Sequence, residues 1–156
     1  MNANDTIFAL ALASNFQPKQ HLTWAIQQLA CLGALELSHV YQIPCRDGVG
    51  EDYLNCACIL RCHLSSQDLQ DLLKDLEQHT GRVRPSHKIS LDIDLIAWGK
   101  QLSELQLNQK KMPFAPDVKI PMYELIANDD FSYTEMVNYP KIRLPLESID
   151  CAIAAS

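Results

Sequence analysis

The sequence has no long apolar run and no recognisable N-terminal signal. No uninterrupted apolar stretch approaches the roughly 20 residues that an α-helix needs to cross a bilayer. The N-terminal residues also lack the positively charged and apolar segments that together mark a secretory signal. We therefore expect a cytoplasmic protein with no membrane partner.

Positive charge is also scarce. The 156 residues contain 13 lysines and arginines against 19 aspartates and glutamates, so the formal net charge is -6. Proteins that bind nucleic acid usually present basic patches, so we expect no nucleic-acid partner and only a local site for any phosphate. The length predicts a single domain over residues 1–156, with a core at 5–99 and an extension at 100–156. We expect a monomer or a weak homodimer.

The six cysteines are predicted to be free thiols, because thiols stay reduced in chains without a secretory signal. Cys56, Cys58 and Cys62 share the parity of Leu54 and Leu60 on a predicted strand, which favours a place in the core. Their spacing is not that of structural zinc sites. A thiol-based metal-binding protein is an alternative that requires Cys56 and Cys58 to face outward.

Hydrophobic periodicity predicts an α+β fold. Strands are expected at 6–13, 35–43, 53–63 and 91–98. Helices are expected from 18 to a stop near 33, and over 66–79. This order is the βαββαβ arrangement of ferredoxin-like folds. Both helices would cover one face of the sheet, and the other face would stay open for a ligand.

The proline-rich extension is less regular. We expect short helices near 121–127 and 146–154, and a mobile loop at 44–51 that contains two glycines.

A basic loop leads into an acidic pair on the last predicted strand. Asp92 and Asp94 lie two residues apart, so their carboxylates project to one side, roughly 7 Å apart, and repel each other. A divalent cation such as magnesium relieves this repulsion, because it binds carboxylates and shares its site with phosphates. The cations of the loop, Arg82, Arg84 and Lys88, then act as phosphate ligands. A solvated strand with two outward acids is the alternative.

The apolar residues of this strand predict its core face. We expect the following to face the core: Leu91, Ile93, Leu95 and Ala97. The opposite face would carry Asp92, Asp94, Ile96 and Trp98. Tyr53 and Asn55 have the parity of this second face, so they are expected near the acidic pair.

In their order and spacing, these segments resemble the hydroxymethyl-dihydropterin pyrophosphokinase family of folate biosynthesis. The resemblance covers about residues 5–99. It rests on Ala13-Ser14-Asn15, Asp52-Tyr53-Leu54-Asn55, Glu77, Gly81-Arg82-Val83-Arg84 and Leu91-Asp92-Ile93-Asp94. It implies pyrophosphoryl transfer from ATP, the co-substrate, to 6-hydroxymethyl-7,8-dihydropterin.

The resemblance also implies roles on the substrate and metal side. Asp92 and Asp94 would hold two Mg²⁺ ions that bridge the ATP phosphates. Tyr53 and Asn55 would bind the pterin, because an amide matches the donor and acceptor edge of that ring. A half-buried strand start is the alternative explanation for Tyr53 and Asn55.

On the phosphate side, the resemblance implies that Arg82 and Arg84 contact the nucleotide and take part in catalysis together with Lys88. Glu77 would lie beside the nucleotide or brace the arginines. A solvated loop is the alternative for the two arginines.

The sequence departs from the family pattern in two segments that contribute to the site. Only PSHKISL separates Arg84 from Asp92, whereas the family has a longer loop with a tryptophan and an arginine. Lys88 supplies a charge there, but a lysine does not reproduce a guanidinium fork.

The second departure follows the last predicted strand, where the family's proline-histidine segment, arginine and aromatic residue are replaced by LNQKKMPFAPDVKIP. Lys110, Lys111 and Phe114 are candidate substitutes, and a solvated lysine pair is the alternative. These departures motivate a second hypothesis, a catalytically impaired paralogue that acts as a pterin- or nucleotide-binding module.

Overall fold

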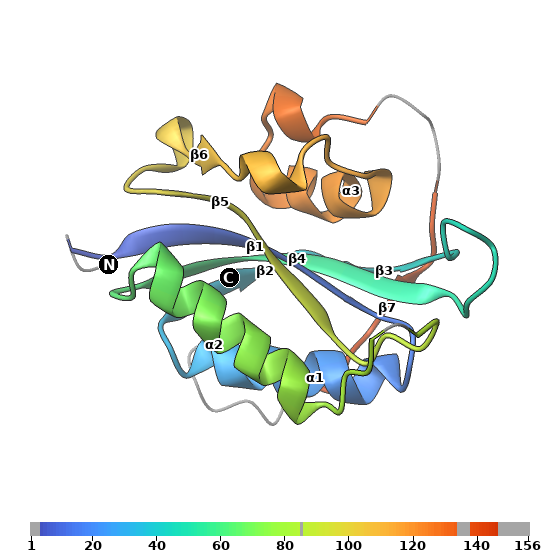
Figure 1. Cartoon of the computed structure of the whole chain (residues 1–156). Coiled ribbons are helices and arrows are strands. Elements are labelled where there is room, and N and C mark those ends of the chain that lie inside the picture. The colour runs from blue at the N-terminus through green and yellow to red at the C-terminus, as the bar shows by residue number, and fades with distance from the viewer. Residues whose placement is uncertain (1–3, 85, 134–137, 147–156) are drawn as a thin grey trace.

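A seven-stranded antiparallel sheet lies in the middle of the protein, with α1 and α2 on one face and α3 on the other (Figure 1). This computed structural model describes residues 4–84, 86–133 and 138–146. The strands are β1 (Thr6–Ser14), β2 (Ala34–Leu37), β3 (Val40–Ile43), β4 (Tyr53–Cys62), β5 (Asp92–Gly99), β6 (Gln106–Leu107) and β7 (Lys141–Ile142). The α-helices are α1 (Pro18–Ala30), α2 (Ser66–His79) and α3 (Pro116–Leu125).

The strand order confirms the predicted ferredoxin-like fold. The strands run in the order β6-β5-β1-β4-β3-β7, and β2 also pairs with β4. The predicted strand 35–43 is interrupted at Ser38, whose Oγ accepts the hydrogen bond of Ala57 N at 2.8 Å in place of a backbone carbonyl. Because a side chain enters the ladder there, β2 and β3 are separate strands on the same neighbour.

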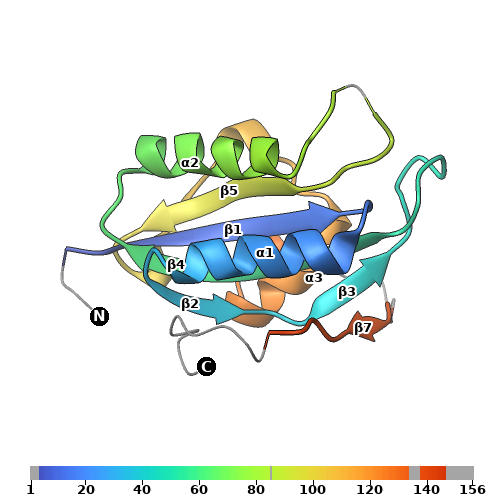
Figure 2. The same cartoon turned by 90° about the horizontal axis from the view of Figure 1, so that it is seen from below.

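The two predicted helices lie side by side along one face of the sheet (Figure 2). The Oγ of Ser65 accepts the N–H of Asp68 at 3.1 Å and caps α2. The core between these helices and the sheet contains Phe8, Leu10 and Leu12 of β1. Residues of β4 and β5 belong to the same core, so this layer also anchors the two strands that carry the candidate site.

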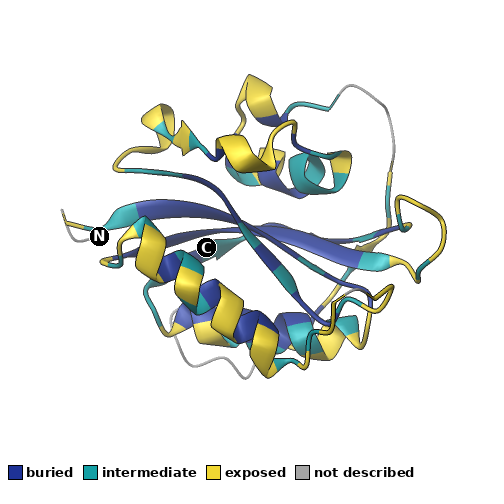
Figure 3. Cartoon of the chain, in the orientation of Figure 1, coloured by how far each residue is buried: buried dark blue, intermediate teal, exposed yellow. Residues whose placement is uncertain are grey.

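The second face of the sheet is also covered, so the expectation of an open face is wrong for most of its area. Phe114 and Met122 of the extension pack on Ala9 and Ile59 of the sheet, and Figure 3 shows buried strands between two partly exposed layers. The helix expected near 121–127 extends over Pro116–Leu125 instead and contains Pro121 in its interior. The second expected helix, at 146–154, lies almost wholly outside the described residues.

A register shift in β5 corrects the predicted faces of two residues. The pairing of β5 with β1 skips Ile96, so the alternation of side chains reverses beyond it. Leu95 lies in the helix-side core as predicted, but Ala97 packs in the cluster around α3 and Trp98 packs against the helix-side core. Alternation along the sequence assigns the wrong face here, because a bulge inserts one residue into the strand and leaves no sign of it in the residue types.

The cysteines of β4 confirm their predicted structural place. Cys56, Cys58 and Cys62 are buried in the helix-side core. Burial raises the pKa of the Cys56 thiol to about 12 and also raises the pKa of Cys58. Inward-facing thiols contradict the metal-binding alternative. Within the described part of the chain, no helix is long and apolar enough to span a membrane.

Gly33 supplies a test of how the turn between α1 and β2 packs against β4. A Cβ at this position would lie 2.0 Å from the carbonyl oxygen of Arg61, so Gly33→Ala forces the backbone apart. We expect a loss of about 3 kcal/mol in the free energy of unfolding, measured by urea denaturation. Gly48→Ala is the control, because its Cβ meets nothing within 4 Å and only its φ of 72° costs about 1 kcal/mol. Equal losses in both variants would contradict the clash.

Candidate active site

Asp92 and Asp94 lie at the start of β5, beside small residues of the neighbouring strand. In the register of the sheet, Asp92 pairs with Ala13 and Asp94 pairs with Ala11. Alanine side chains leave free volume on this face between the acidic pair and the first turn of α3. Asp92 and Asp94 are therefore only half-buried.

Two cavities share the acidic pair. The larger, of about 720 Å³, lies between α2, the basic loop and β5, and Glu77, Arg82, Arg84 and Lys111 line it. The smaller, of about 260 Å³, lies between the sheet, the 44–47 loop and the start of α3. Asp92 and Asp94 line both cavities. A group bound at the acidic pair would contact ligands in either cavity.

Glu77, in the last turn of α2, connects the helix to the acidic strand. Its Oε2 accepts the backbone N–H of Ile93 at 2.9 Å, and its Oε1 accepts a hydrogen bond from Arg84 Nη2 at 3.2 Å. Glu77 thus braces Arg84, one of the two roles expected for it. Most of the Arg84 side chain remains exposed to solvent.

Arg82 lies deeper than Arg84. Its Nη1 donates to the carbonyl of Leu91 at 2.9 Å and lies 3.9 Å from Asp92 Oδ1. Its side chain is 10% exposed, and its buried Nε has no hydrogen-bond partner among the described residues. A desolvated guanidinium with an unused donor is suited to an anionic ligand. The solvated-loop alternative is wrong for Arg82.

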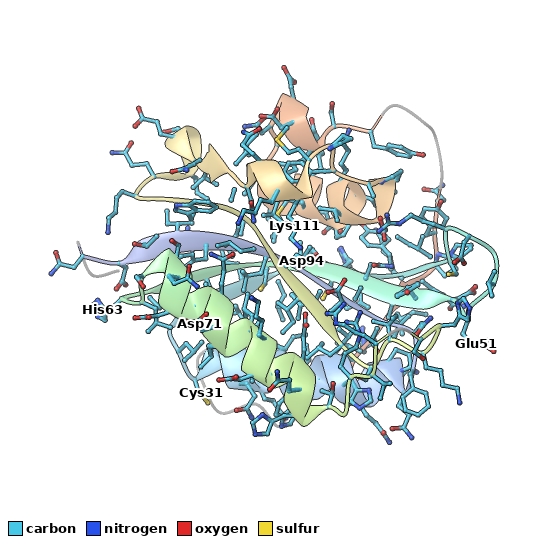
Figure 4. All side chains as sticks on the ribbon, in the orientation of Figure 1. Cys31, Glu51, His63, Asp71, Asp94 and Lys111 are labelled. Atoms are coloured by element: carbon cyan, nitrogen blue, oxygen red, sulfur yellow. The ribbon has the colours of Figure 1, made fainter. Side chains whose placement is uncertain are left out.

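Lys111 reaches the acidic pair from the extension. Its Nζ lies 2.9 Å from Asp94 Oδ1, and Figure 4 shows the two side chains meeting where the extension approaches β5. Both lysines are exposed, but only Lys111 has an ion pair with the acidic residues, so the alternative of a solvated lysine pair describes Lys110 and not Lys111. Phe114 is buried in the core beneath α3.

Asn108 fixes the segment that carries Lys111, and sequence reasoning missed it. Its Nδ2 donates to the carbonyl of Leu95 at 2.7 Å, and its backbone N–H donates to the carbonyl of Ile96 at 2.8 Å. Its Oδ1 accepts the N–H of Lys110 at 3.2 Å, which caps the following 3-10 turn. The sequence signal for it was weak, an asparagine two residues before the lysine pair, because its burial depends on the tertiary structure.

The crowded carboxylates control the electrostatics of the site. Burial, then the charges of Asp94 and Glu77, raise the pKa of Asp92 to about 6. Burial alone would lower the pKa of Lys111, but the hydrogen bond and charge of Asp94 outweigh it and raise that pKa. The site therefore holds a carboxylate that stays partly protonated near neutrality beside a firmly charged lysine.

The donor set at the acidic pair fits a hard divalent cation that shares its ligands with a substrate. Among the described residues, no group of three or more His, Cys, Asp and Glu side chains is placed to hold a metal ion. Magnesium is commonly bound by one or two carboxylates together with phosphates and water. Two neighbouring carboxylates that face a cationic cavity meet this requirement.

The smaller cavity contains the two residues expected to bind a heterocycle. Tyr53 and Asn55 both line it, next to the acidic pair. Asn55 is 3% exposed, and its buried Nδ2 has no partner within the described ranges. Burial raises the pKa of Tyr53, and the neighbouring Cys45 and Asp92 add to the rise. Arg46 and Asp117 also line this cavity and were missed, because the loop and the extension carry no periodic pattern.

The basic loop is held in place by Asn15, at the end of β1. Asn15 exchanges two hydrogen bonds with the backbone of Ile89, at 2.9 and 2.5 Å, and donates a third to the carbonyl of His87 at 2.8 Å. Lys88 points away from the cavities, with its Nζ 5.5 Å from the centroid of the Phe16 ring. The structure thus brings seven of the eight expected residues together and leaves Lys88 apart.

Comparison with known proteins agrees with this geometry. The family model described as 7,8-dihydro-6-hydroxymethylpterin-pyrophosphokinase (HPPK) matches residues 9–136. A Pseudomonas aeruginosa protein named 2-amino-4-hydroxy-6-hydroxymethyldihydropteridine pyrophosphokinase is 28% identical over 143 residues, covering 87% of this chain and 82% of the relative. A Synechocystis protein of the same name is 31% identical over 151 residues, covering 91% and 75%.

The raised pKa of Asp92 predicts a pH-dependent stability. The folded protein holds this proton up to about pH 6, whereas the unfolded chain releases it near pH 4. Stability is therefore lost as the pH rises from 4 through 6. Asp92→Asn removes the ionisation, so we expect a higher Tm than that of the unmodified protein at pH 8, in buffer with a chelator. The difference should shrink towards pH 4.

Asp75→Asn is the matched control, because it removes the same charge from an exposed position on α2. Its Tm should follow that of the unmodified protein at every pH. An Asp92→Asn variant that also does so would show that ionised Asp92 is not penalised in the fold.

Proposed function

Because the chain belongs to the 7,8-dihydro-6-hydroxymethylpterin-pyrophosphokinase family, we propose that it transfers a pyrophosphoryl group from ATP to 6-hydroxymethyl-7,8-dihydropterin. The hydroxyl oxygen of the pterin attacks the β-phosphorus of ATP in line. The bond from that phosphorus to the α-phosphate oxygen breaks, AMP leaves, and the hydroxyl proton is released. The products are AMP and the pterin diphosphate.

One observation carries this proposal: the acidic pair lines two cavities of different chemistry. The larger cavity has cationic walls that suit the phosphates of a nucleotide, and the smaller has an aromatic ring and an amide that suit a flat heterocycle. A transfer between two bound substrates needs such neighbouring sites, because most of its catalysis comes from positioning.

In the larger cavity, Arg82 and Arg84 bind the phosphates, and Glu77 keeps Arg84 oriented. The buried, unused Nε of Arg82 supports this role, since a phosphate oxygen would satisfy it. Asp92 and Asp94 would hold two Mg²⁺ ions, which would neutralise the charge of the phosphates. The low exposure of Arg82 makes its charge act strongly there.

Lys111 provides the cation nearest to the reacting groups. Its Nζ lies at the acidic pair, whereas Lys88 lies against the Phe16 ring. We assign to Lys111 the charge stabilisation that the shortened basic loop no longer supplies through an arginine, and to Lys88 a secondary role at the outer edge of the loop. As a lysine, Lys111 acts as a mobile point charge.

In the smaller cavity, Asn55 and Tyr53 hold the pterin. The unpartnered Nδ2 of Asn55 donates to the ring, and the Tyr53 side chain walls the cavity beside it. Both residues line this cavity together with Asp92 and Asp94, which supports a ring substituent that reaches the phosphates.

The short basic loop also favours a second candidate, a binding module that retains pterin and nucleotide sites without transfer. AMP release from purified protein with MgATP and 6-hydroxymethyl-7,8-dihydropterin separates the two functions. AMP formation supports the pyrophosphokinase. No AMP, with pterin and ATP binding still measurable by calorimetry, supports the module.

The acidic pair is the first target for substitution. Asp92→Ala combined with Asp94→Ala should abolish magnesium-dependent ATP binding and AMP release, because two of the protein's metal ligands are lost. Asp71→Ala combined with Asp75→Ala removes the same charge from exposed positions on α2 and should leave both unchanged. Retained magnesium-dependent binding in the Asp92/Asp94 variant would refute the metal assignment.

Lys111 is tested by two measurements that should move in opposite directions. Lys111→Met removes the cation that pairs with Asp94, so Mg²⁺ affinity without nucleotide should rise. Turnover should fall about 100-fold, since a charge aimed at the transition state is lost. Turnover and calorimetric Mg²⁺ titrations check this.

Lys110→Met and Lys88→Met are the controls, and each should keep turnover within about threefold of the unmodified enzyme. A larger loss in Lys88→Met than in Lys111→Met would return the catalytic charge to Lys88.

A further inference from the structure

We propose that Asp117 determines the ring specificity of the smaller cavity by accepting hydrogen bonds from the amino-substituted edge of the heterocycle. The inference rests on the proposed function and deepens it, because it assigns a residue to the recognition of the 2-amino group and the adjacent ring N–H. Asp117 is a binding residue, separate from the groups at the phosphates.

The two carboxylate oxygens of Asp117 have different surroundings. Asp117 lies in the first turn of α3, and its Oδ2 accepts a hydrogen bond from Arg46 Nη2 at 3.1 Å. Its Oδ1 is buried and has no hydrogen-bond partner among the described residues. The side chain is 13% exposed and lines the smaller cavity. A buried charged oxygen without a partner is costly, and a donor from a ligand would remove that cost.

A second unpartnered group lies in the same cavity. Asn55 enters it from β4, on the side opposite α3, and its buried Nδ2 lacks a partner in the described part of the chain. Asn55 is 3% exposed, so solvent hardly reaches it. One cavity thus contains an unused donor and an unused acceptor on different elements. A ligand with both a hydrogen-bond acceptor and a donor on its rim would satisfy these two groups.

The pterin ring has such a rim. Its 4-oxo group accepts a hydrogen bond, and the neighbouring ring N–H and 2-amino group donate. Asn55 Nδ2 matches the oxo group, and Asp117 Oδ1 matches the donors. Because the acceptor is a carboxylate, the bonds to it are stronger than bonds to a neutral oxygen. A ring with a 2-oxo group in place of the amino group would face Asp117 with an oxygen and be rejected.

The other carboxylates around the smaller cavity have other partners. Asp92 and Asp94 also line the larger cavity, where they serve the phosphates. Asp47 Oδ1 accepts hydrogen bonds from Cys45 Sγ and Val49 N within its own loop, both at 3.0 Å. Asp47 is also exposed to solvent, so among the described carboxylates that line this cavity only Asp117 has a buried oxygen without a partner.

The test compares two rings that differ at one position. Calorimetry with 6-hydroxymethylpterin and 6-hydroxymethyllumazine, in the presence of Mg²⁺ and α,β-methylene-ATP, gives the preference for a 2-amino over a 2-oxo group. We expect the unmodified protein to prefer the pterin by about 100-fold or more. Asp117→Asn should reduce this preference to within about tenfold, because an amide also donates to a 2-oxo group.

Arg46→Ala is the control for a merely structural role. Arg46 is largely exposed and donates its hydrogen bond to Asp117 Oδ2. Its removal therefore frees the 44–51 loop without changing the surroundings of Asp117 Oδ1. Arg46→Ala should weaken both ligands alike and keep the preference. The Tm of each variant, measured without ligand, checks that the fold is intact.

The outcomes separate this inference from the function on which it rests. A full preference for pterin in Asp117→Asn overturns the role of Asp117 and leaves the pyrophosphokinase proposal standing. If Arg46→Ala loses the preference for pterin as fully as Asp117→Asn does, Asp117 acts through the loop, and its proposed role in recognising the ring is also overturned. If the unmodified protein binds neither ring, the proposed function fails, and this inference fails with it.

Discussion

The crowding of three carboxylates at the start of β5 is the constraint on which the site depends. Asp92, Asp94 and Glu77 repel one another, and burial adds to the cost, as the raised pKa of Asp92 records. Arg82 and Lys111 lie close enough to offset part of it. These groups come from the helix, the loop, the strand and the extension, so the acidic pair is held only when all four segments are folded together.

The two faces of the sheet have different tasks. The face under α1 and α2 is closed by a continuous apolar core, which fixes the register of the central strands. The extension covers only part of the other face. Beside the covered part, two small residues of β1, Ala11 and Ala13, line the smaller cavity. The extension that covers this face also supplies Lys111 and Asp117, so the chemistry that distinguishes this chain comes from its least regular segment.

What the sequence predicts well is what depends on local periodicity. Asp92, Asp94 and Asn55 lie on the expected face, because alternation along a strand needs no knowledge of the partner strand. Ala97 and Trp98 do not, because a bulge depends on how two strands meet. Contacts such as Lys111 with Asp94, or Arg46 with Asp117, join segments whose approach is set by tertiary packing, and no short pattern encodes it.

The charges around the larger cavity account for its proposed need for metal. Three acidic groups, Asp92, Asp94 and Glu77, face four basic ones, so the cavity has only a small formal positive charge before a ligand binds. The basic residues are Lys74, Arg82, Arg84 and Lys111. ATP adds about four negative charges, most of them on the groups being transferred. Two divalent cations at the acidic pair would restore the balance without any further basic residue. The shortened basic loop would then make the proposed transfer more dependent on magnesium, because fewer protein cations would offset the charge of ATP.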